Sequence, residues 1–290
     1  MIAIEQLRYV VLGTSNLAGA AEFAQRTLGL EPVDRTASLA TFRSDGRDYT
    51  LAFLADDPAI QAVGFEVREP KTLDIAVDAL RARGLRAERG TAEECKLRKV
   101  RDLVWFYDHS GNRIELVVRP LNSGWRYFPS RDAGIMGFDG VMLRSTAVAK
   151  DEELWTELLG ARVSDWAGSA PYLRIDAAHH RLALFPADRA GVLAVEYAVE
   201  NVNLMMRNYY VLQNSQVAIM HGPGRRPTSE QLFLTFAGPD GVLYSFVSEG
   251  QPADGGLERR PRQFPAGPEG LCSWGSENKV KEFNTTEARQ

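Results

Sequence analysis

The chain repeats itself at a nearly constant spacing. The stretch FYDHSGNRIELV at 106–117 corresponds to FAGPDGVLYSFV at 236–247, at an offset of 130 residues. Three further pairs have offsets of 131 or 132, namely VVL (10–12) with VML (141–143), LG (28–29) with LG (159–160), and VGFEV (63–67) with VEYAV (195–199). Four matches whose offsets drift by only two residues indicate one structural unit built twice.

Composition agrees with two modules. A chain of 290 residues that is 44% hydrophobic and 25% charged can bury two cores of about 110 to 130 residues each. The net charge of -4 gives no basic field for nucleic acid. No apolar run approaches the ~20 residues of a membrane span, and the N-terminus lacks the regions of a signal peptide. Two isolated cysteines, Cys95 and Cys272, are typical of a reducing compartment. We therefore expect a cytoplasmic protein that binds neither nucleic acid nor membrane.

Hydrophobic periodicity and turn residues predict the same order of elements in each half. The first half predicts strand 7–12, helix 17–27, strands 41–43, 50–54 and 62–67, helix 72–83, and a hairpin of 104–107 with 113–118. The second half predicts strand 138–143, helix 150–159, strands 172–175, 181–185 and 193–199, helix 203–214, and a hairpin around 238–241. We expect an N-terminal module over 1–134, ending in a linker at 120–134, a C-terminal module over 135–250, and a tail over 251–290 that wraps rather than folds alone.

Several motifs resemble the vicinal oxygen chelate superfamily, which includes glyoxalases, bleomycin resistance proteins and dioxygenases. Within it they are most similar to the two-domain type I extradiol ring-cleavage dioxygenases of the 2,3-dihydroxybiphenyl dioxygenase kind. The resemblance covers roughly residues 5 to 275. It rests on HHRLAL at 179–184, GPGRRPTS at 222–229, FLTF at 233–236, GPDG at 238–241, RQFP at 262–265, and first-half stretches at 62–67 and 96–120.

The resemblance implies an α+β fold of two tandem modules, each a pair of βαβββ units curled into a half-open barrel. In that family iron is held only in the C-terminal module, by two histidines and a glutamate, which leaves positions open for a catecholate and dioxygen. Carried over position by position, these ligands fall on Gly140, Ala194 and Ser245. Glycine and alanine offer no donor atom, and a lone serine is a poor ligand for a transition metal. We therefore predict no bound metal and no cofactor.

Two further positions depart from the family pattern. The histidine that the resemblance implies in the 222–229 loop is Arg226 here, and the tyrosine implied on the following strand is Thr235. The slots of the first module, Tyr9, Ala62 and Glu115, cannot form a metal site either. Of the remaining histidines, His109 falls in a hairpin turn of the first module and His221 opens a loop, so neither is expected to restore one.

The two adjacent histidines of the family pattern are retained in this sequence, as His179 and His180. The resemblance assigns the second member, His180, as an acid/base group, and imidazole can do this at neutral pH without a metal. In the alternative interpretation His179 and His180 only begin a strand and bond locally. Adjacent residues on a strand face opposite ways, so one of the two is expected to face the pocket.

Glu196 is the second candidate. Alternation along 193–199 puts Ala194, Glu196 and Ala198 on one face. A carboxylate inside the module needs a partner or a raised pKa, and Arg144 and Arg226 are the candidate partners. Glu196 is then either half of a structural ion pair or a general base working with His180, and in a third alternative the register differs and Glu196 faces solvent. The catalytic candidates are His180, Glu196 and Arg226, and the candidate substrate-binding residues are His179, Gly140, Met142, Arg144, Tyr172, Ala194, Thr228, Thr235 and Ser245.

Three functions follow as hypotheses. The first, which we favour from the sequence, is a metal-independent enzyme doing acid/base chemistry on an aromatic or aromatic-derived substrate, such as C–C hydrolysis, isomerisation, cyclisation or elimination. The second is a non-catalytic protein that binds an aromatic compound. The third is an atypical Fe(II) extradiol ring-cleavage dioxygenase. In each case the expected partner is a small aromatic or phenolic compound, and the resemblance implies a homo-oligomer.

Overall fold

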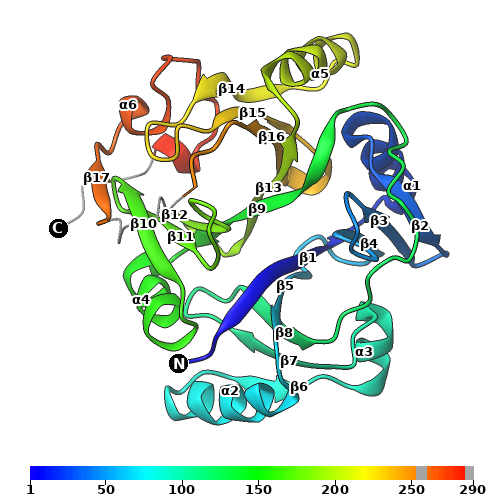
Figure 1. Ribbon diagram of the computed structural model, residues 1–290, viewed down its shortest axis with the longest axis vertical. Helices are drawn as coiled ribbons and strands as arrows, with labels where there is room; N and C mark the ends of the chain where they lie inside the picture. Colours follow the sequence, from blue (N-terminus) through cyan, green and yellow to red (C-terminus); the bar gives the residue numbers. More distant parts are fainter. Residues whose placement is uncertain (253–259, 285–290) are drawn as a thin grey trace.

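Two curled sheets dominate the computed structural model, which describes residues 1–252 and 260–284 (Figure 1). The first sheet has the strand order β2-β3-β4-β1-β5-β8-β7-β6, and the second has the order β14-β15-β16-β13-β9-β12-β11-β10-β17. The strands of the first sheet are β1 (Ile4–Thr14), β2 (Glu31–Arg35), β3 (Leu39–Arg43), β4 (Leu51–Ala55), β5 (Gln61–Val67), β6 (Ala87–Arg89), β7 (Asp102–Tyr107) and β8 (Arg113–Val118). Those of the second are β9 (Ile135–Ser145), β10 (Arg162–Ala167), β11 (Ala170–Arg174), β12 (Leu182–Pro186), β13 (Gly191–Val199), β14 (Ile219–Arg225), β15 (Leu232–Ala237), β16 (Leu243–Ser248) and β17 (Arg262–Phe264).

Each sheet joins two βαβββ units side by side. In the first sheet β1 pairs with β4 in parallel and with β5 in antiparallel orientation, and β9 does the same with β12 and β13 in the second. The first strands of the two units therefore lie at the centre of each sheet. The predicted α+β class, with two tandem modules that each form a half-open barrel, is confirmed. The helices are α1 (Leu17–Glu22), α2 (Pro70–Ala82), α3 (Ala92–Arg98), α4 (Val148–Glu153), α5 (Val202–Asn214) and α6 (Pro268–Leu271), with π-helical turns Phe23–Leu28 and Leu154–Leu158 continuing α1 and α4.

The main apolar core is shared by the two modules. Trp155, in the turn that continues α4, lies with its ring 4.9 Å from that of Phe65 on β5. Reciprocally, Phe23 at the end of α1 lies 5.0 Å from Tyr244 on β16. One apolar cluster thereby runs through both modules. The expectation of two separate cores needs correction, because a helix from each module packs on the sheet of the other.

Smaller clusters fill the concave side of each sheet. Tyr9, Tyr49 and Trp105 belong to the first, and Tyr172 and Phe185 to the second. The described part of the tail adds to the second cluster. There β17 pairs in parallel with β10, and Val280 and Phe283 of the last segment are buried, with the Phe283 ring 4.7 Å from Phe185. The tail residues 253–259 and 285–290 lie outside the described residues.

Several predicted elements differ from those observed. The predicted helix 17–27 is a short α1 followed by a wider π-helical turn. Strands β2, β6, β10 and β14 were not predicted because they lack a clear apolar alternation, and all of them except β10 lie at a sheet edge. His221 does not open a loop but lies within β14, where the GPGR sequence pairs with β15 through two register shifts.

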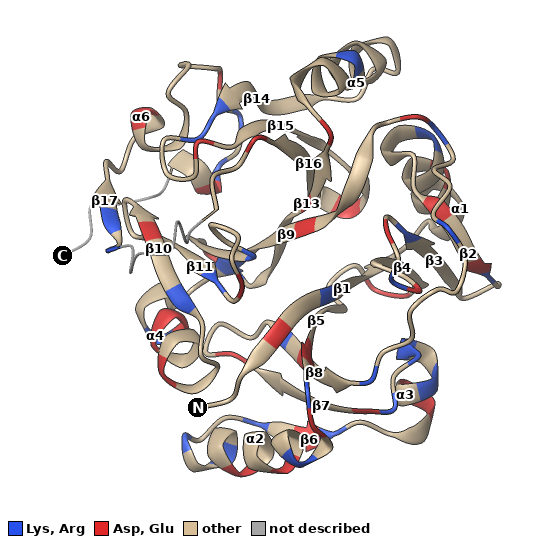
Figure 2. Ribbon diagram, in the orientation of Figure 1, with Lys and Arg blue, Asp and Glu red and all other residues tan. Residues whose placement is uncertain are grey.

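Charges of both signs are mixed along the outer helices and strands (Figure 2). Among the described residues, none of the helices is long and apolar enough to cross a membrane.

Candidate functional site

The two adjacent histidines lie in the turn between β11 and β12, and both are buried. His179 Nε2 lies 2.9 Å from Asp165 Oδ2, and the two rings meet through their Nδ1 atoms, 3.1 Å apart. The expectation that only one ring faces inward is wrong, because the pair precedes β12 and does not obey the alternation of a strand. Tyr172 packs edge-on against both rings, with centroids 4.9 Å from His180 and 6.1 Å from His179.

The inner nitrogen of His180 faces a buried ion pair. His180 Nε2 lies 3.3 Å from Glu196 Oε2 and 3.4 Å from Arg226 Nη1. Arg226 Nη2 donates to Glu196 Oε1, and Arg226 Nη1 donates to Gln231 Oε1 at 2.5 Å. Glu196 has no exposed surface and Arg226 only 4%. The structure thus brings the three predicted catalytic candidates together.

These contacts fix the ionisation of Glu196. Burial alone would raise its pKa, but Arg226 and His180 outweigh burial and lower the pKa of Glu196 to about 2. A carboxyl group of that acidity is a poor proton acceptor at neutral pH. Burial also acts on Tyr172, and it outweighs the opposing charge of Arg226 and raises the pKa of the phenol to about 12. Of the two roles considered for Glu196, the geometry favours half of an ion pair.

Backbone pairing shows which residues of the second sheet lie opposite one another on neighbouring strands, that is, at the same level of the sheet. Glu196 on β13 lies opposite Gly140 on β9 and opposite Ser245 on β16. Ala194 lies one step away, opposite Met142 and Leu243. A methyl group on Gly140 would lie 3.0 Å from Glu196 Oε2, so the carboxylate occupies the space over the glycine.

The first module has the same arrangement with the residue types exchanged. Gly64 on β5 lies opposite Tyr9 on β1 and Glu115 on β8. Tyr9 fills the space over the glycine, because a methyl group there would lie 2.4 Å from the tyrosine ring. Tyr9 donates to Glu115 Oε2 at 2.7 Å, and Arg98 binds both carboxylate oxygens. Each module therefore holds a buried glutamate paired with an arginine at this level.

The residues at this level do not fit the iron that the family resemblance implies. Gly140 has no donor, and the Ser245 hydroxyl shares a 2.8 Å hydrogen bond with Thr235. Glu196 already binds the guanidinium of Arg226. Over the described ranges 1–252 and 260–284, no group of three His, Cys, Asp or Glu residues could hold a metal ion.

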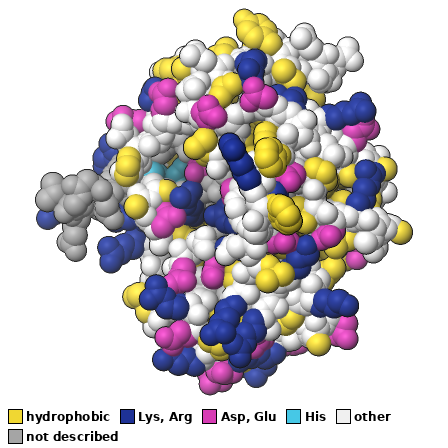
Figure 3. All heavy atoms as spheres, turned by 45° about the vertical axis from the view of Figure 1, so that its right-hand side comes forward, with side chains coloured by type: hydrophobic (Ala, Val, Ile, Leu, Met, Phe, Trp, Pro, Cys, Tyr) yellow, Lys and Arg dark blue, Asp and Glu magenta, His cyan; other side chains and the backbone are white. Residues whose placement is uncertain are grey.

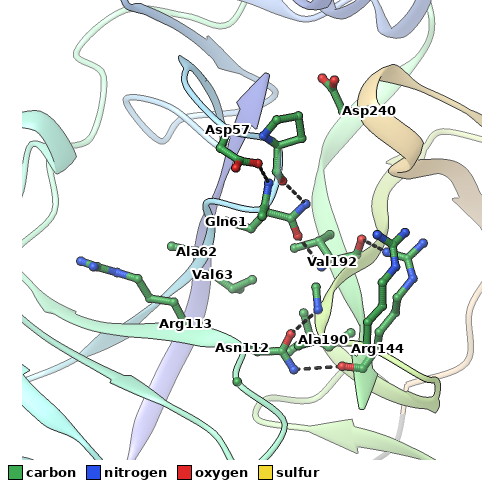
Figure 4. Close-up of a pocket in the computed structure, with 16 residues that line it drawn as sticks. Asp57, Gln61, Ala62, Val63, Asn112, Arg113, Arg144, Ala190, Val192 and Asp240 are labelled. Atoms are coloured by element: carbon green, nitrogen blue, oxygen red, sulfur yellow. Dashed lines mark hydrogen bonds between the residues drawn. The ribbon is translucent and has the colours of Figure 1, made fainter. Parts of the chain in front are cut away.

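Arg144 is not part of this cluster. It donates to Glu282 Oε1 at 2.5 Å and to the carbonyl of Val192 at 2.7 Å. Figure 4 shows it on the wall of a cavity of about 500 Å³ between the modules, across from Gln61 and to the right of Asn112. The expectation that Arg144 could pair with Glu196 is corrected, because the arginine extends toward the other end of the barrel.

The remaining predicted binding residues divide into two groups. Met142 and Ala194 lie in the apolar cluster inside the second module. Thr228 is buried, and its carbonyl accepts a hydrogen bond of 2.6 Å from Arg262. These residues shape the walls of the module rather than the surface next to His180.

A recess of about 330 Å³ leads to the histidine pair from outside. Figure 3 shows histidine atoms in a hollow of the face that it views. The recess has apolar walls as well as hydrogen-bonding groups, and its lining includes Ala178, His179, His180, Ala198, Val199, Ser229, Gln231, Val247 and Ser248. This recess reaches both histidines, whereas the cavity beside Arg144 is lined by neither of them.

Sequence reasoning missed two residues of the cluster. Asp165 is a completely buried carboxylate on β10, and Gln231 bridges Arg226 and Asp139. A charged residue inside a strand was the available signal for Asp165, but β10 itself was not predicted. Gln231 lies just outside the quoted motifs.

The fold, with two tandem modules, is the architecture that the resemblance to the vicinal oxygen chelate superfamily implies. Residues 6–116 match the family model "Glyoxalase/Bleomycin resistance protein/Dioxygenase superfamily", which confirms the predicted resemblance. The N-terminal module is thus similar in sequence to that superfamily.

Individual proteins with known names are also similar to this chain. The chain is 25% identical over 228 residues to an iron-dependent extradiol dioxygenase of Rhodococcus jostii, covering 69% of this chain and 74% of the relative. Its fold matches the Mn(II)-bound glyoxalase from Novosphingobium aromaticivorans, with a TM-score of 0.86, 21% identity, and coverage of 100% of this chain and 97% of the other. It also matches homoprotocatechuate 2,3-dioxygenase from Arthrobacter globiformis, with a TM-score of 0.83, 21% identity, and coverage of 99% and 92%.

These comparisons overturn the function favoured from the sequence. A metal-independent acid/base enzyme is contradicted, because the matched relative is named an iron-dependent extradiol dioxygenase. The favoured function rested on the three missing ligands at Gly140, Ala194 and Ser245, whereas the match to the dioxygenase extends over 69% of the chain.

Proposed function

We propose that this protein is an enzyme of the extradiol dioxygenase kind that takes a catechol-like aromatic compound in its C-terminal module. The observation that carries the proposal is the match over 228 residues to the Rhodococcus jostii extradiol dioxygenase. A match covering 69% of the chain includes more than one module, so it reflects more than a shared half-barrel.

The recess beside His180 suits such a compound. Its volume of about 330 Å³ is near the lower end of the range for small-molecule sites, roughly 300–1,000 Å³. Ala198, Val199 and Val247 offer apolar contact for a ring, while Ser229 and Gln231 offer hydrogen bonds to hydroxyl groups. The imidazole of His180 at the wall of the recess can bind a phenolic hydroxyl.

Ring cleavage by iron would require donors other than Gly140, Ala194 and Ser245. The fold of the relatives supports the substrate class, whereas the donor chemistry of these three positions does not support their iron site.

A second candidate is a protein that binds the aromatic compound without turning it over. The specific observation in its favour is the Arg226–Glu196 ion pair, which places a cation and its counter-ion at the level where the family resemblance implies a metal site. The same superfamily fold can host unrelated functions, so this candidate needs its own test.

One experiment separates the two. The purified protein is incubated anaerobically with Fe(II), then mixed with catechol or 2,3-dihydroxybiphenyl in air while oxygen uptake and product absorbance are recorded. Uptake equal to the product formed supports the enzyme, and calorimetric binding without uptake supports the second candidate. Neither binding nor uptake with either compound contradicts both.

A matched pair of variants makes the result specific. His180→Gln should lower affinity or turnover, because the phenol loses its imidazole partner. His109→Gln is the control, since His109 is an exposed residue in the turn between β7 and β8. Equal effects of the two substitutions would show that His180 does not contact the bound compound.

A further inference from the structure

We propose that Asp165 and His179 are positioning residues that fix the tautomer of His180. In the neutral form of the pair they hold the ring proton of His180 on Nδ1 and leave its lone pair on Nε2. The inference concerns the protonation of an unliganded side chain, so it stands or falls separately from ring cleavage.

Hydrogen bonds from Arg262 of the tail help to keep Asp165 ionised. Its Oδ1 accepts from the backbone N–H of Arg262 at 2.8 Å and from Nε at 3.2 Å, and its Oδ2 accepts from Nη2 at 2.9 Å. Burial would raise the pKa of Asp165, but the hydrogen bonds from His179 and Arg262 lower it overall. The side chain is therefore a carboxylate, which can only accept hydrogen bonds.

The positions of the ring protons follow from the row of side chains Asp165, His179 and His180. His179 Nε2, 2.9 Å from Asp165 Oδ2, must carry a proton, because two acceptors would repel at that distance. A neutral imidazole has one N–H, so His179 Nδ1 is an acceptor. His180 Nδ1, 3.1 Å away, must donate to it. This leaves His180 Nε2 without a proton when both rings are neutral.

The two side chains nearest Nε2 act on its protonation in opposite senses. Arg226 Nη1, 3.4 Å away, can only donate, which suits an unprotonated nitrogen. Glu196 Oε2 lies 3.3 Å from the same nitrogen and has no hydrogen-bond partner among the described residues. As an acceptor it favours a proton on Nε2, and Asp165 and His179 counteract that preference. A proton that arrives at Nε2 would give that carboxylate oxygen its missing donor. Tyr172, whose pKa burial raises, remains a neutral phenol beside the ring.

Four segments of the chain build this row. Asp165 comes from β10, the histidines from the turn before β12, Glu196 from β13, and Arg262 from β17 of the tail. The edge-on packing of Tyr172 against both imidazoles restricts rotation of the rings. The tail thus reaches His180 indirectly, through Asp165 and His179.

Nuclear magnetic resonance of protein labelled with ¹⁵N in histidine tests the assignment directly. The chain has four histidines, so His109→Gln and His221→Phe variants suffice to separate the signals of the pair. Long-range ¹H–¹⁵N spectra are recorded at a pH where both rings are neutral. We expect the proton on Nε2 of His179 and on Nδ1 of His180. A wild-type His180 with its proton on Nε2 would overturn the proposal.

Two variants test the cause. Asp165→Asn replaces an obligatory acceptor by an amide that can also donate, and His179→Phe removes the acceptor for His180 Nδ1. In each folded variant we expect the His180 proton to move, partly or wholly, to Nε2 next to Glu196. Asp176→Asn is the control, because Asp176 binds Arg181 outside the row. An unchanged Nδ1 proton in both test variants contradicts the roles of Asp165 and His179, and the wild-type spectrum decides the tautomer if a variant fails to fold.

Discussion

At the scale of single residues, the Arg226–Glu196 pair places two opposite charges in the interior of the second module. Removing one member of a buried pair leaves the other charge without a partner. Arg226→Leu should therefore lower the free energy of unfolding by roughly 3–5 kcal/mol, measured by urea denaturation. The double variant Arg226→Leu/Glu196→Leu should recover most of this loss.

A neighbouring arginine provides the control for that series. Arg225 forms a partly exposed pair with Glu249 at 3.1 Å. Arg225→Ala should change the free energy of unfolding by at most about 1 kcal/mol, because exposed pairs contribute little. A loss for Arg226→Leu as small as this would show that the buried pair is not a stabilising contact.

The same pair predicts a response to acid. The pKa of Glu196 falls from its usual 4.5 to about 2 on folding, so its contribution to stability is present above pH 4.5. That contribution should be lost as the pH falls from 4.5 toward 2. The free energy of unfolding, plotted against pH over this range, should change less for Glu196→Gln than for the wild type. Parallel plots for the two proteins would contradict the assignment.

At the scale of elements, the turn between β7 and β8 forms hydrogen bonds with the second module. Asp108 accepts hydrogen bonds from the backbone of Ser110 and Asn112, and Asn112 Nδ2 donates to the carbonyl of Arg144 on β9. Ser110 Oγ donates to Asp151 Oδ2 on α4 at 2.5 Å. Two carboxylates thus approach each other where the modules meet.

This turn should respond to pH in the opposite sense to Glu196. Burial and the charge of Asp151 raise the pKa of Asp108 from 3.8 to about 7. The folded state therefore holds this proton more tightly, and stability should fall as the pH rises from about 4 to 7. Asp108→Asn should flatten stability against pH in this window, whereas a variant that keeps the wild-type slope would exclude Asp108 as the cause.

At the scale of the whole molecule, the shared core predicts that the modules unfold together. Trp155 packs against Phe65 of the other module and has no exposed surface. Trp155→Ala should cost roughly 3–5 kcal/mol and keep a single unfolding transition by calorimetry. Trp125→Ala is the control, because Trp125 is 83% exposed. Two separated transitions in the wild-type protein would contradict a shared core.

The homo-oligomer implied by the family resemblance stays a prediction. Several large apolar side chains are exposed in and near the stretch that links the modules, including Leu121, Trp125, Phe128 and Met136. Sedimentation of the purified protein would give its association state.

The sequence by itself determined the doubled unit, the order of its main elements and the face on which Glu196 lies. Repeats and alternation are read along the chain itself, so they do not depend on how the strands pair with one another. Only the tertiary structure showed that Glu196, rather than Ala194, lies level with Gly140 and Ser245. Alternation has a period of two, so it cannot distinguish residues 194 and 196. The partners of Arg144 and the place of Asp165 were likewise decided by strands distant in sequence, because cross-strand hydrogen bonds and packing set which side chains meet.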